Sequence, residues 1–321
     1  MMLPRLFAAA TFAMLALSQA FAQDFPSKRL TIVVPFPAGS PADVRARIIA
    51  TQLSMRVKQP VIVDNRPGAS GNIAAQLVAK AKPDGYTMLY ANNGQIAINP
   101  HLYANPGFDG VKDFAPVTQL VSIPWVLIAN TELPVKSVAD LIALAKKQPG
   151  KLSYASSGIG TPQHVLGEQF EKMAEIDMLH VPYKGENLSV NDLLNGQIAV
   201  LFGTPVSTLP LIKANKVKVL GVSAVKRIRS LPDVPLVSET LPGFAAMGWA
   251  VIEVPAATPV DIVAMLNKHI TQIMLMPEIK DKEEAAGYEV LANTPQQAAA
   301  AIKEESARYA KLIAELKLRV E

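Results

Sequence analysis

The sequence predicts an α/β protein of two lobes, in which two doubly wound sheets are joined by crossing strands. Apolar runs rich in Val, Ile and Leu alternate with longer helical patterns along most of the 321 residues. This strand–helix order occurs over roughly 24–119 and again over 120–224. One strand-like stretch and three helices follow. They are too few for a third domain, so we expect the chain to return to the first lobe.

Strands are predicted where short aliphatic and β-branched runs are bounded by turn residues. In chain order these runs are Leu30–Val34, Val61–Asp64, Thr87–Ala91, Val117–Val121, Val126–Ala129, Leu152–Ala155, Leu179–Val181, Ile198–Phe202, Val217–Ser223, Trp249–Val254 and Glu289–Leu291. Their alternation with helices predicts parallel sheets that carry helices on both faces.

Helices are predicted where apolar residues recur with helical spacing after a capping residue or a proline. In chain order they are Pro41–Val57, Gly71–Ala81, Ser137–Lys147, Pro162–Glu175, Leu188–Asn195, Val206–Lys213, Pro259–Leu275, Pro277–Ala286 and Pro295–Leu316. A proline at the first helical position needs no hydrogen-bond acceptor, which makes it a common way to begin a helix.

Residues 1–22 are predicted to be a secretory signal peptide. Arg5 gives a positive start, residues 6–17 are apolar, and Ala20-Phe21-Ala22 has the pattern of a cleavage site. The apolar run is too short for a good membrane span, and no later segment is apolar enough to cross a bilayer. The remaining chain is expected to form one lobe from 23–119 plus 225–321 and a second from 120–224.

The composition narrows the class of protein. The chain has no cysteine, which excludes disulfides and lipidation of a cysteine. A soluble periplasmic protein stabilised by its core fits these features. The net charge of +4 is scattered rather than gathered on one segment, so we expect neither nucleic-acid binding nor stable membrane insertion. We expect a monomer.

Two strand-to-helix junctions are candidates for binding an anion. Each runs from an apolar strand through glycine and a hydroxyl to a proline that begins a helix. Such a junction presents unpaired N–H groups and the positive end of a helix dipole. Thr258-Pro259 and Thr294-Pro295 begin helices without a preceding glycine, so glycine distinguishes the candidates. The predicted ligand-binding residues are Gly39 and Ser40 in the first junction and Ser156, Ser157, Gly158, Gly160 and Thr161 in the second.

The sequence allows two interpretations of several other residues. Two segments directly follow predicted strands, Asn92-Asn93 and Phe202-Gly203-Thr204. Each is either a loop that contacts the ligand or a plain turn. Trp249 is either a wall for the ligand or part of the interface core. His164 either points at the ligand or is a polar residue at a helix start. Asp43 has the spacing of a capping acid, and it could also meet an ammonium group.

Catalysis and cofactor binding find little support in the sequence. The sequence contains neither the phosphate-binding loop G-x-x-x-x-G-K-[ST] nor the dinucleotide-binding pattern G-x-G-x-x-G. It also lacks a cysteine nucleophile and a G-x-S-x-G elbow. The four histidines, at 101, 164, 180 and 269, show no metal-binding spacing. We therefore expect a binding protein without enzymatic activity, cofactor or metal.

The mature chain resembles the Bug receptors, the periplasmic solute-binding proteins of tripartite tricarboxylate transporters. The matching segments run in order along nearly all of it: Phe25–Lys28, Val34–Gly39, Asp64–Asn72, Pro83–Thr87, Ile98–Tyr103, Val181–Gly185 and Leu231–Pro235. The resemblance implies a type II-like periplasmic binding fold that closes on a small carboxylate and hands it to a two-subunit membrane permease.

The resemblance also implies which loops bind the ligand. In the family, the loops matching Phe36–Asp43 and Ser156–His164 pinch a carboxylate, which adds Phe36, Ala38, Asp43 and His164 to the candidates. The chain departs from the family at Ser40-Pro41-Ala42, where glycine and threonine are usual, and at Gly203-Thr204, where many members have Asp-Asn. A receptor for a signalling partner is the alternative function, followed by a hydrolase of the same fold.

Overall fold

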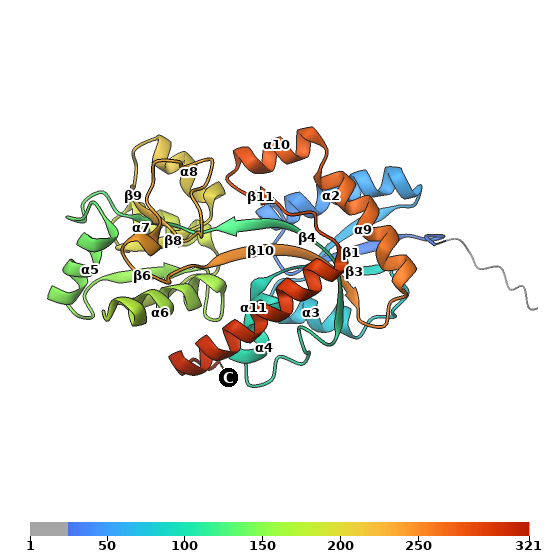
Figure 1. The fold of residues 1–321 in the computed structure, drawn as a ribbon, viewed down its shortest axis with the longest axis horizontal. Coiled ribbons are helices and arrows are strands. Elements are labelled where there is room, and N and C mark those ends of the chain that lie inside the picture. Colours follow the sequence, from blue (N-terminus) through green and yellow to red (C-terminus); the bar gives the residue numbers. More distant parts are fainter. Residues whose placement is uncertain (1–24, 321) are drawn as a thin grey trace, which may run out of the picture.

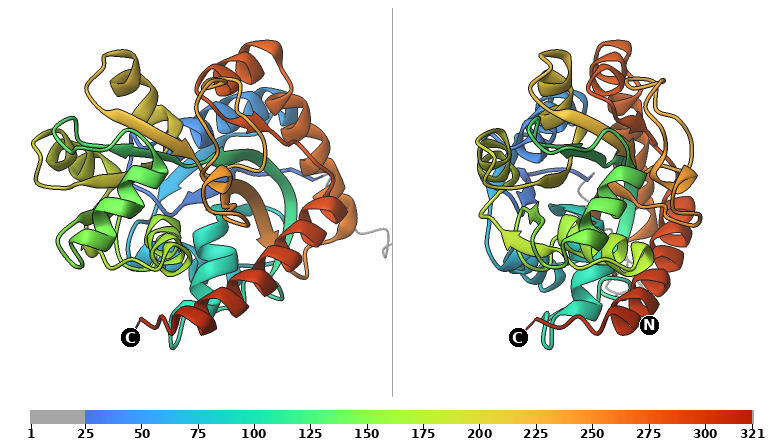
Figure 2. Two further views of the ribbon diagram at one scale, coloured as in Figure 1. Left: turned by 60° about the vertical axis from the view of Figure 1, so that its left-hand side comes forward. Right: turned by 90° about the vertical axis from the view of Figure 1, so that its left-hand side faces the viewer.

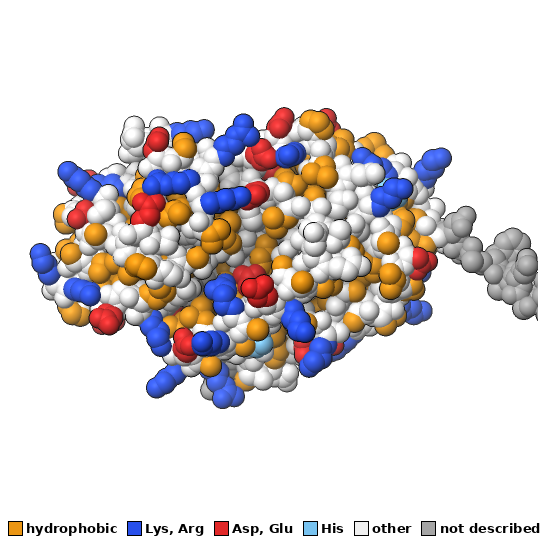
Figure 3. All heavy atoms as spheres, in the orientation of Figure 1, with side chains coloured by type: hydrophobic (Ala, Val, Ile, Leu, Met, Phe, Trp, Pro, Cys, Tyr) orange, Lys and Arg blue, Asp and Glu red, His pale blue; other side chains and the backbone are white. Residues whose placement is uncertain are grey.

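The computed structural model describes residues 25–320, and the predicted signal peptide lies outside them. Two α/β lobes lie side by side, and two long strands run between them (Figure 1). No helix within residues 25–320 is long and apolar enough to cross a membrane. Lys and Arg side chains are dispersed over the face shown in Figure 3, as the sequence predicted.

The first lobe contains a six-stranded sheet in the order β11-β4-β10-β3-β1-β2. Its strands are β1 (Leu30–Val34), β2 (Val61–Asn65), β3 (Thr87–Asn92), β4 (Phe114–Pro124), β10 (Met247–Pro255) and β11 (Glu289–Val290). One face is covered by α2 (Pro41–Val57), α9 (Val260–Met274) and α10 (Pro277–Ala285). The other is covered by α3 (Asn72–Ala79), the π-helical η2 (Gly94–Ile98), α4 (Asn99–Leu102) and α11 (Pro295–Leu316).

The second lobe contains a five-stranded sheet in the order β7-β6-β8-β5-β9. Its strands are β5 (Val126–Ala129), β6 (Ser153–Ser156), β7 (Leu179–Pro182), β8 (Val200–Gly203) and β9 (Lys218–Val222). Helices α5 (Val138–Lys147) and α6 (Pro162–Ala174) cover one face. Helices α7 (Glu186–Leu194) and α8 (Pro205–Lys213) cover the other. The short 3-10 helices are η1 (Ala69–Gly71) and η3 (Val237–Glu239).

The predicted parallel pairing is correct for only part of each sheet, because both sheets are mixed. Among the strands named above, the parallel pairs form the triplets β3-β1-β2 in the first lobe and β7-β6-β8 in the second. Strand β4 leads out of the first lobe into β5, and β10 leads back. Since the outgoing and returning strands run side by side in opposite directions, β10 pairs antiparallel with β4 from Met247↔Pro124 to Pro255↔Phe114.

The helical segment formed by η2 and α4 was not predicted. It contains a glycine and a proline, which have poor helix propensity, so local sequence gave no helical signal. Every residue of Gly94–Ile98 is buried, and packing on the sheet therefore outweighs propensity. Helix α11, whose predicted bounds were correct, lies along the first lobe and also packs against α6 of the second (Figure 2).

Candidate functional site

The predicted loops lie at the carboxyl ends of the parallel strands. In open α/β sheets this edge is where ligands bind. Strand β1, which leads to Gly39-Ser40, is the middle strand of the first parallel triplet, β3-β1-β2. Strand β6, which leads to Ser156–His164, is the middle strand of the second, β7-β6-β8. The two junctions therefore occupy equivalent places in the two lobes.

Contacts between the lobes show that the two edges face each other. The Ser70 hydroxyl, in η1 after β2, donates to the Ile159 carbonyl after β6 at 3.0 Å. A side chain at Gly94, after β3, would come within 3.2 Å of Pro162 at the start of α6. Within residues 25–320, no hydrogen bond joins Gly39-Ser40 directly to the Ser156–His164 loop. A ligand bound between the lobes could therefore bridge Gly39-Ser40 and the Ser156–His164 loop.

The first junction is held by Asp43. Its buried carboxylate accepts hydrogen bonds from the Gly39 N–H at 2.8 Å, Asn65 Nδ2 at 2.9 Å and Arg47 Nε at 3.0 Å. Burial alone would raise the pKa of Asp43, but the bonds from Arg47, Gly39 and Asn65 hold the pKa below its usual value. The side chain thus orders the loop, in line with its capping spacing. Ser40 accepts from the Asp43 N–H at 3.3 Å.

Other parts of this junction face solvent or the core. Ala38 and Gly39 are exposed, and the space beside Gly39 is open to 4 Å. The φ of +80° at Gly39 is one that favours glycine. Phe36 packs against the core of the first lobe, and its carbonyl accepts from Asn65.

The second junction is a loop whose own groups pair with one another. Ser156 Oγ lies 3.1 Å from the Gly158 carbonyl. The Thr161 hydroxyl donates to the same carbonyl at 2.8 Å. The Gly160 N–H donates to His164 Nδ1 at 3.3 Å. Because Thr161 turns back into the loop, its side chain does not cap α6. The first-turn N–H groups of this helix are therefore left for another acceptor.

Gln163 is a positioning residue that the sequence reading did not single out. Its buried side chain accepts from the Ser157 N–H at 2.9 Å and donates to the Phe202 carbonyl at 2.9 Å. It therefore fixes the β6–α6 loop to the end of β8. A glutamine at the second position of a helix that follows a glycine-rich turn was the only available signal.

Behind this loop lies a pair of stacked imidazoles. The rings of His164 and His180 are 4.3 Å apart, and His180 Nε2 is 2.7 Å from Ser156 Oγ. With Glu168 they form a group of potential metal donors, all within 4.8 Å of one another. Each of the three side chains already has a hydrogen-bond partner. His164 accepts from the Gly160 N–H, His180 lies beside the Ser156 hydroxyl, and Glu168 accepts from the Tyr154 hydroxyl. The sequence reading expected no metal here, and these three residues are where one could be held.

We expect His180 to make stability depend on pH. Burial and then the neighbouring His164 lower the pKa of His180 from 6.5 to about 4. On acidification from pH 7 toward pH 4, His180 therefore binds a proton in the unfolded chain but stays neutral in the folded protein. Stability should be complete above pH 6.5 and fall below it. His180→Gln should show a smaller drop in melting temperature between pH 7.5 and pH 5, and an identical drop would contradict this assignment.

The third predicted loop, Phe202-Gly203-Thr204, is engaged internally. Phe202 packs in the core of the second lobe. The Thr204 N–H donates to Oε1 of Glu186 at 2.6 Å. Glu186 was not predicted as a site residue. The sequence feature that could have indicated it is the position of an acidic residue directly after the Val181–Gly185 motif.

Asn92, Asn93 and Trp249 lie around the start of η2 and the crossing strand β10. Asn92 Oδ1 accepts from the Gly94 N–H at 2.8 Å and so begins the π-helix. Asn93 Nδ2 donates to the Tyr309 hydroxyl of α11 at 3.3 Å. The buried Trp249 indole donates to Glu305, also on α11. In this structure Asn93 and Trp249 bind α11 through these groups.

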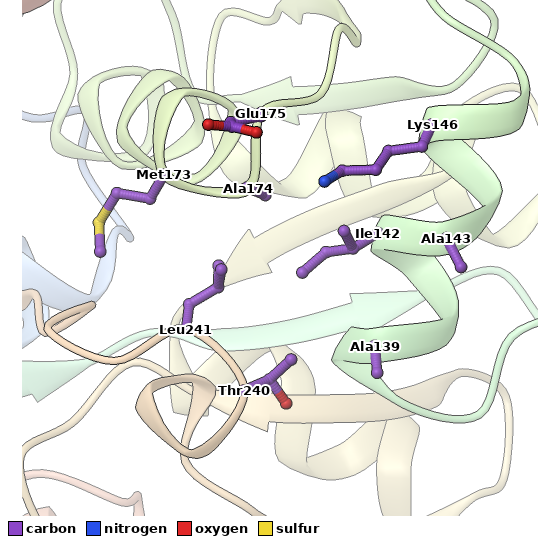
Figure 4. A pocket seen from close by; sticks show the side chains of 9 residues that line it. All are labelled: Ala139, Ile142, Ala143, Lys146, Met173, Ala174, Glu175, Thr240 and Leu241. Atoms are coloured by element: carbon purple, nitrogen blue, oxygen red, sulfur yellow. The ribbon is translucent and has the colours of Figure 1, made fainter.

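Two surface grooves lie away from these loops. One, of about 390 Å³, is lined by Ala139, Ile142, Ala143, Lys146, Met173, Ala174, Glu175, Thr240 and Leu241 (Figure 4). The other is lined by Phe25, Ser27, Lys28, Pro83, Asp84, Tyr86, Pro259 and Ile262. Neither contains a predicted site residue, so the candidate site rests on the facing sheet edges.

Comparisons with known proteins agree with this architecture. The family described as "Tripartite tricarboxylate transporter family receptor" matches residues 45–318. A UPF0065 protein from the tcbD-tcbE intergenic region of Pseudomonas sp. strain P51 is 35% identical over 296 residues, covering 92% of this chain and 88% of its own.

Two solved structures have the same two-lobed fold. Rpa4515 of R. palustris with adipate has a TM-score of 0.85 at 34% identity, covering 92% of this chain and 99% of its own. MatC from Rhodopseudomonas palustris with bound malate has a TM-score of 0.82 at 29% identity, covering 90% and 100%. The predicted fold class is thereby confirmed.

Proposed function

Because this chain belongs to the tripartite tricarboxylate transporter receptor family, we propose that it is a periplasmic receptor that captures a small carboxylate between its lobes and delivers it to a two-subunit membrane permease. The family is one of receptors rather than enzymes. Two solved relatives were obtained with adipate and malate, both of which are carboxylates. The predicted signal peptide supports a periplasmic location.

One observation carries the binding proposal. Helix α6 begins without a side-chain cap, at the edge where the second lobe faces the first. Its free N–H groups and dipole favour an anion. We infer that a ligand carboxylate is held there, with the Gly39-Ser40 loop closing from the other lobe. A ligand favours the closed form only through contacts that the open form lacks.

A thermal-shift measurement tests this function. At a ligand concentration 100 times the Kd, mass action adds about 2.7 kcal/mol to the free energy of unfolding. We expect the melting temperature to rise by roughly 4–5 °C with hexanoate, adipate or malate as probes. Sodium chloride at matched ionic strength, glucose and hexylamine serve as controls. A rise with glucose or hexylamine but with none of the acids would overturn the proposal.

A further inference from the structure

We propose that Glu186 occupies a second anion position in the ligand site and thereby restricts this receptor to carboxylates whose far end carries no negative charge. The inference rests on the proposed function, since it concerns the other end of the ligand bound at α6. It makes Glu186 a specificity-determining residue.

The contacts of Glu186 are those expected of a bound carboxylate. It is the first residue of α7 and reaches the first turn of α8. Its Oε1 accepts from the Thr204 N–H at 2.6 Å and from the Ser207 hydroxyl at 2.5 Å. The Thr204 hydroxyl lies 3.1 Å from its Oε2. Backbone and hydroxyl donors at a helix N-terminus are what an anionic ligand would otherwise use. Here a side chain of the protein has taken them.

Gly203 provides the room for this arrangement. A Cβ at this position would lie 2.4 Å from Thr208 Cγ2 and 3.1 Å from Glu186 Oε1. The backbone of Gly203 is not in the left-handed region, so conformation does not require glycine there. Space does. Gly203 and Glu186 thus form a matched pair, in which a missing side chain on β8 makes room for a carboxylate from α7.

The position of Glu186 relative to α6 defines which end of a ligand it meets. Strands β6 and β8 are neighbours, and their helices α6 and α8 cover opposite faces of the sheet. The start of α6 is nevertheless tied to the end of β8, because Gln163 donates to the Phe202 carbonyl, two residues before Thr204. We infer that a ligand held at the start of α6 extends along this edge toward Glu186. There the first lobe closes against the second, since a side chain at Gly287 would come within 2.5 Å of Pro205.

No cation offsets the carboxylate of Glu186. Within residues 25–320, no Lys, Arg or His nitrogen lies within 4 Å of it. Arg45 of the first lobe is already engaged, because both oxygens of Glu283 bind it at 2.7 and 2.6 Å. A second ligand carboxylate would therefore meet occupied donors and an unpaired negative charge. Like charges at an interface select against the wrong partner.

Matched ligands test the inference. Hexanoate, 6-aminohexanoate and adipate have the same six-carbon chain and differ in the group at the far end, which is a methyl, an ammonium or a carboxylate group. We expect the wild-type protein to bind hexanoate or 6-aminohexanoate at least tenfold more tightly than adipate, measured by isothermal titration. Glu186→Gln should raise adipate affinity roughly tenfold relative to hexanoate, and Glu186→Ala should do the same by freeing the Thr204 and Ser207 donors. Glu132→Gln, which removes an exposed charge from the same lobe, should change neither.

The outcomes separate the two proposals. If the wild-type protein prefers adipate, or if Glu186→Gln changes the affinity for adipate and hexanoate equally, Glu186 does not set specificity while carboxylate binding stands. If no carboxylate binds either protein, the proposed function itself fails and the inference fails with it. Melting curves of each variant show whether the fold is kept. Glu186→Gln retains one side-chain oxygen and the shape of the side chain, so it tests the inference even if Glu186→Ala fails to fold.

Discussion

Gly160→Val is expected to weaken carboxylate binding by about 100-fold or more. Gly160 has a φ of +81°, and a Cβ there would lie 3.0 Å from the Tyr103 hydroxyl and 3.2 Å from Leu102. Both neighbours belong to the first lobe, so a larger side chain obstructs the approach of the lobes as well as straining the loop. A 100-fold loss of affinity corresponds to about 2.8 kcal/mol. The obstruction between the lobes must supply it, because the strained backbone lowers the stability of the free and the ligand-bound protein alike.

Gly196→Val is the matched control. Gly196 has a φ of +78°, so the backbone strain is comparable, but its nearest neighbour would be Asn130 Nδ2 at 3.8 Å. We expect both variants to lose similar stability in melting curves, whereas only Gly160→Val loses affinity for the probe acids in titration calorimetry. Equal affinities in the two variants would place the ligand elsewhere.

The sequence determined the framework because strand and helix signals are local. Capping residues and prolines predicted the observed bounds of α2 and α11. Parallel strands bring their carboxyl ends to one edge, so the positions of the two glycine junctions in the chain were sufficient to place them at the facing edges of the two lobes.

The pairing of polar groups was not predictable in the same way. Gln163 meets Phe202, Glu186 meets Thr204 and Trp249 meets Glu305 across 39, 18 and 56 positions of the chain. Such partners are fixed only when the sheets assemble. Sequence reasoning therefore recognised Thr204 as part of a loop with anion-binding chemistry, but not that an acid of the same chain fills it.

Arg45→Met is expected to lower the free energy of unfolding by about 3–5 kcal/mol, because it leaves a buried acid without its partner. Arg45 is 5% exposed and Glu283 is 8% exposed. Arg45 also donates to the Tyr90 hydroxyl at 2.8 Å, and its guanidinium lies 4.9 Å from the centre of the Tyr288 ring. Urea unfolding at pH 7, followed by circular dichroism, measures the loss.

Two further variants establish whether the loss comes from the broken ion pair. Arg56→Met, at an exposed position of the same helix, should change stability by no more than about 0.5 kcal/mol. The double variant Arg45→Met, Glu283→Leu should recover most of the loss, since replacing a whole buried ion pair by apolar side chains is often neutral. A double variant whose loss equals the sum of the two single losses would show that the two residues act independently. The guanidinium would then stabilise the first lobe mainly through Tyr90 and Tyr288 rather than through Glu283.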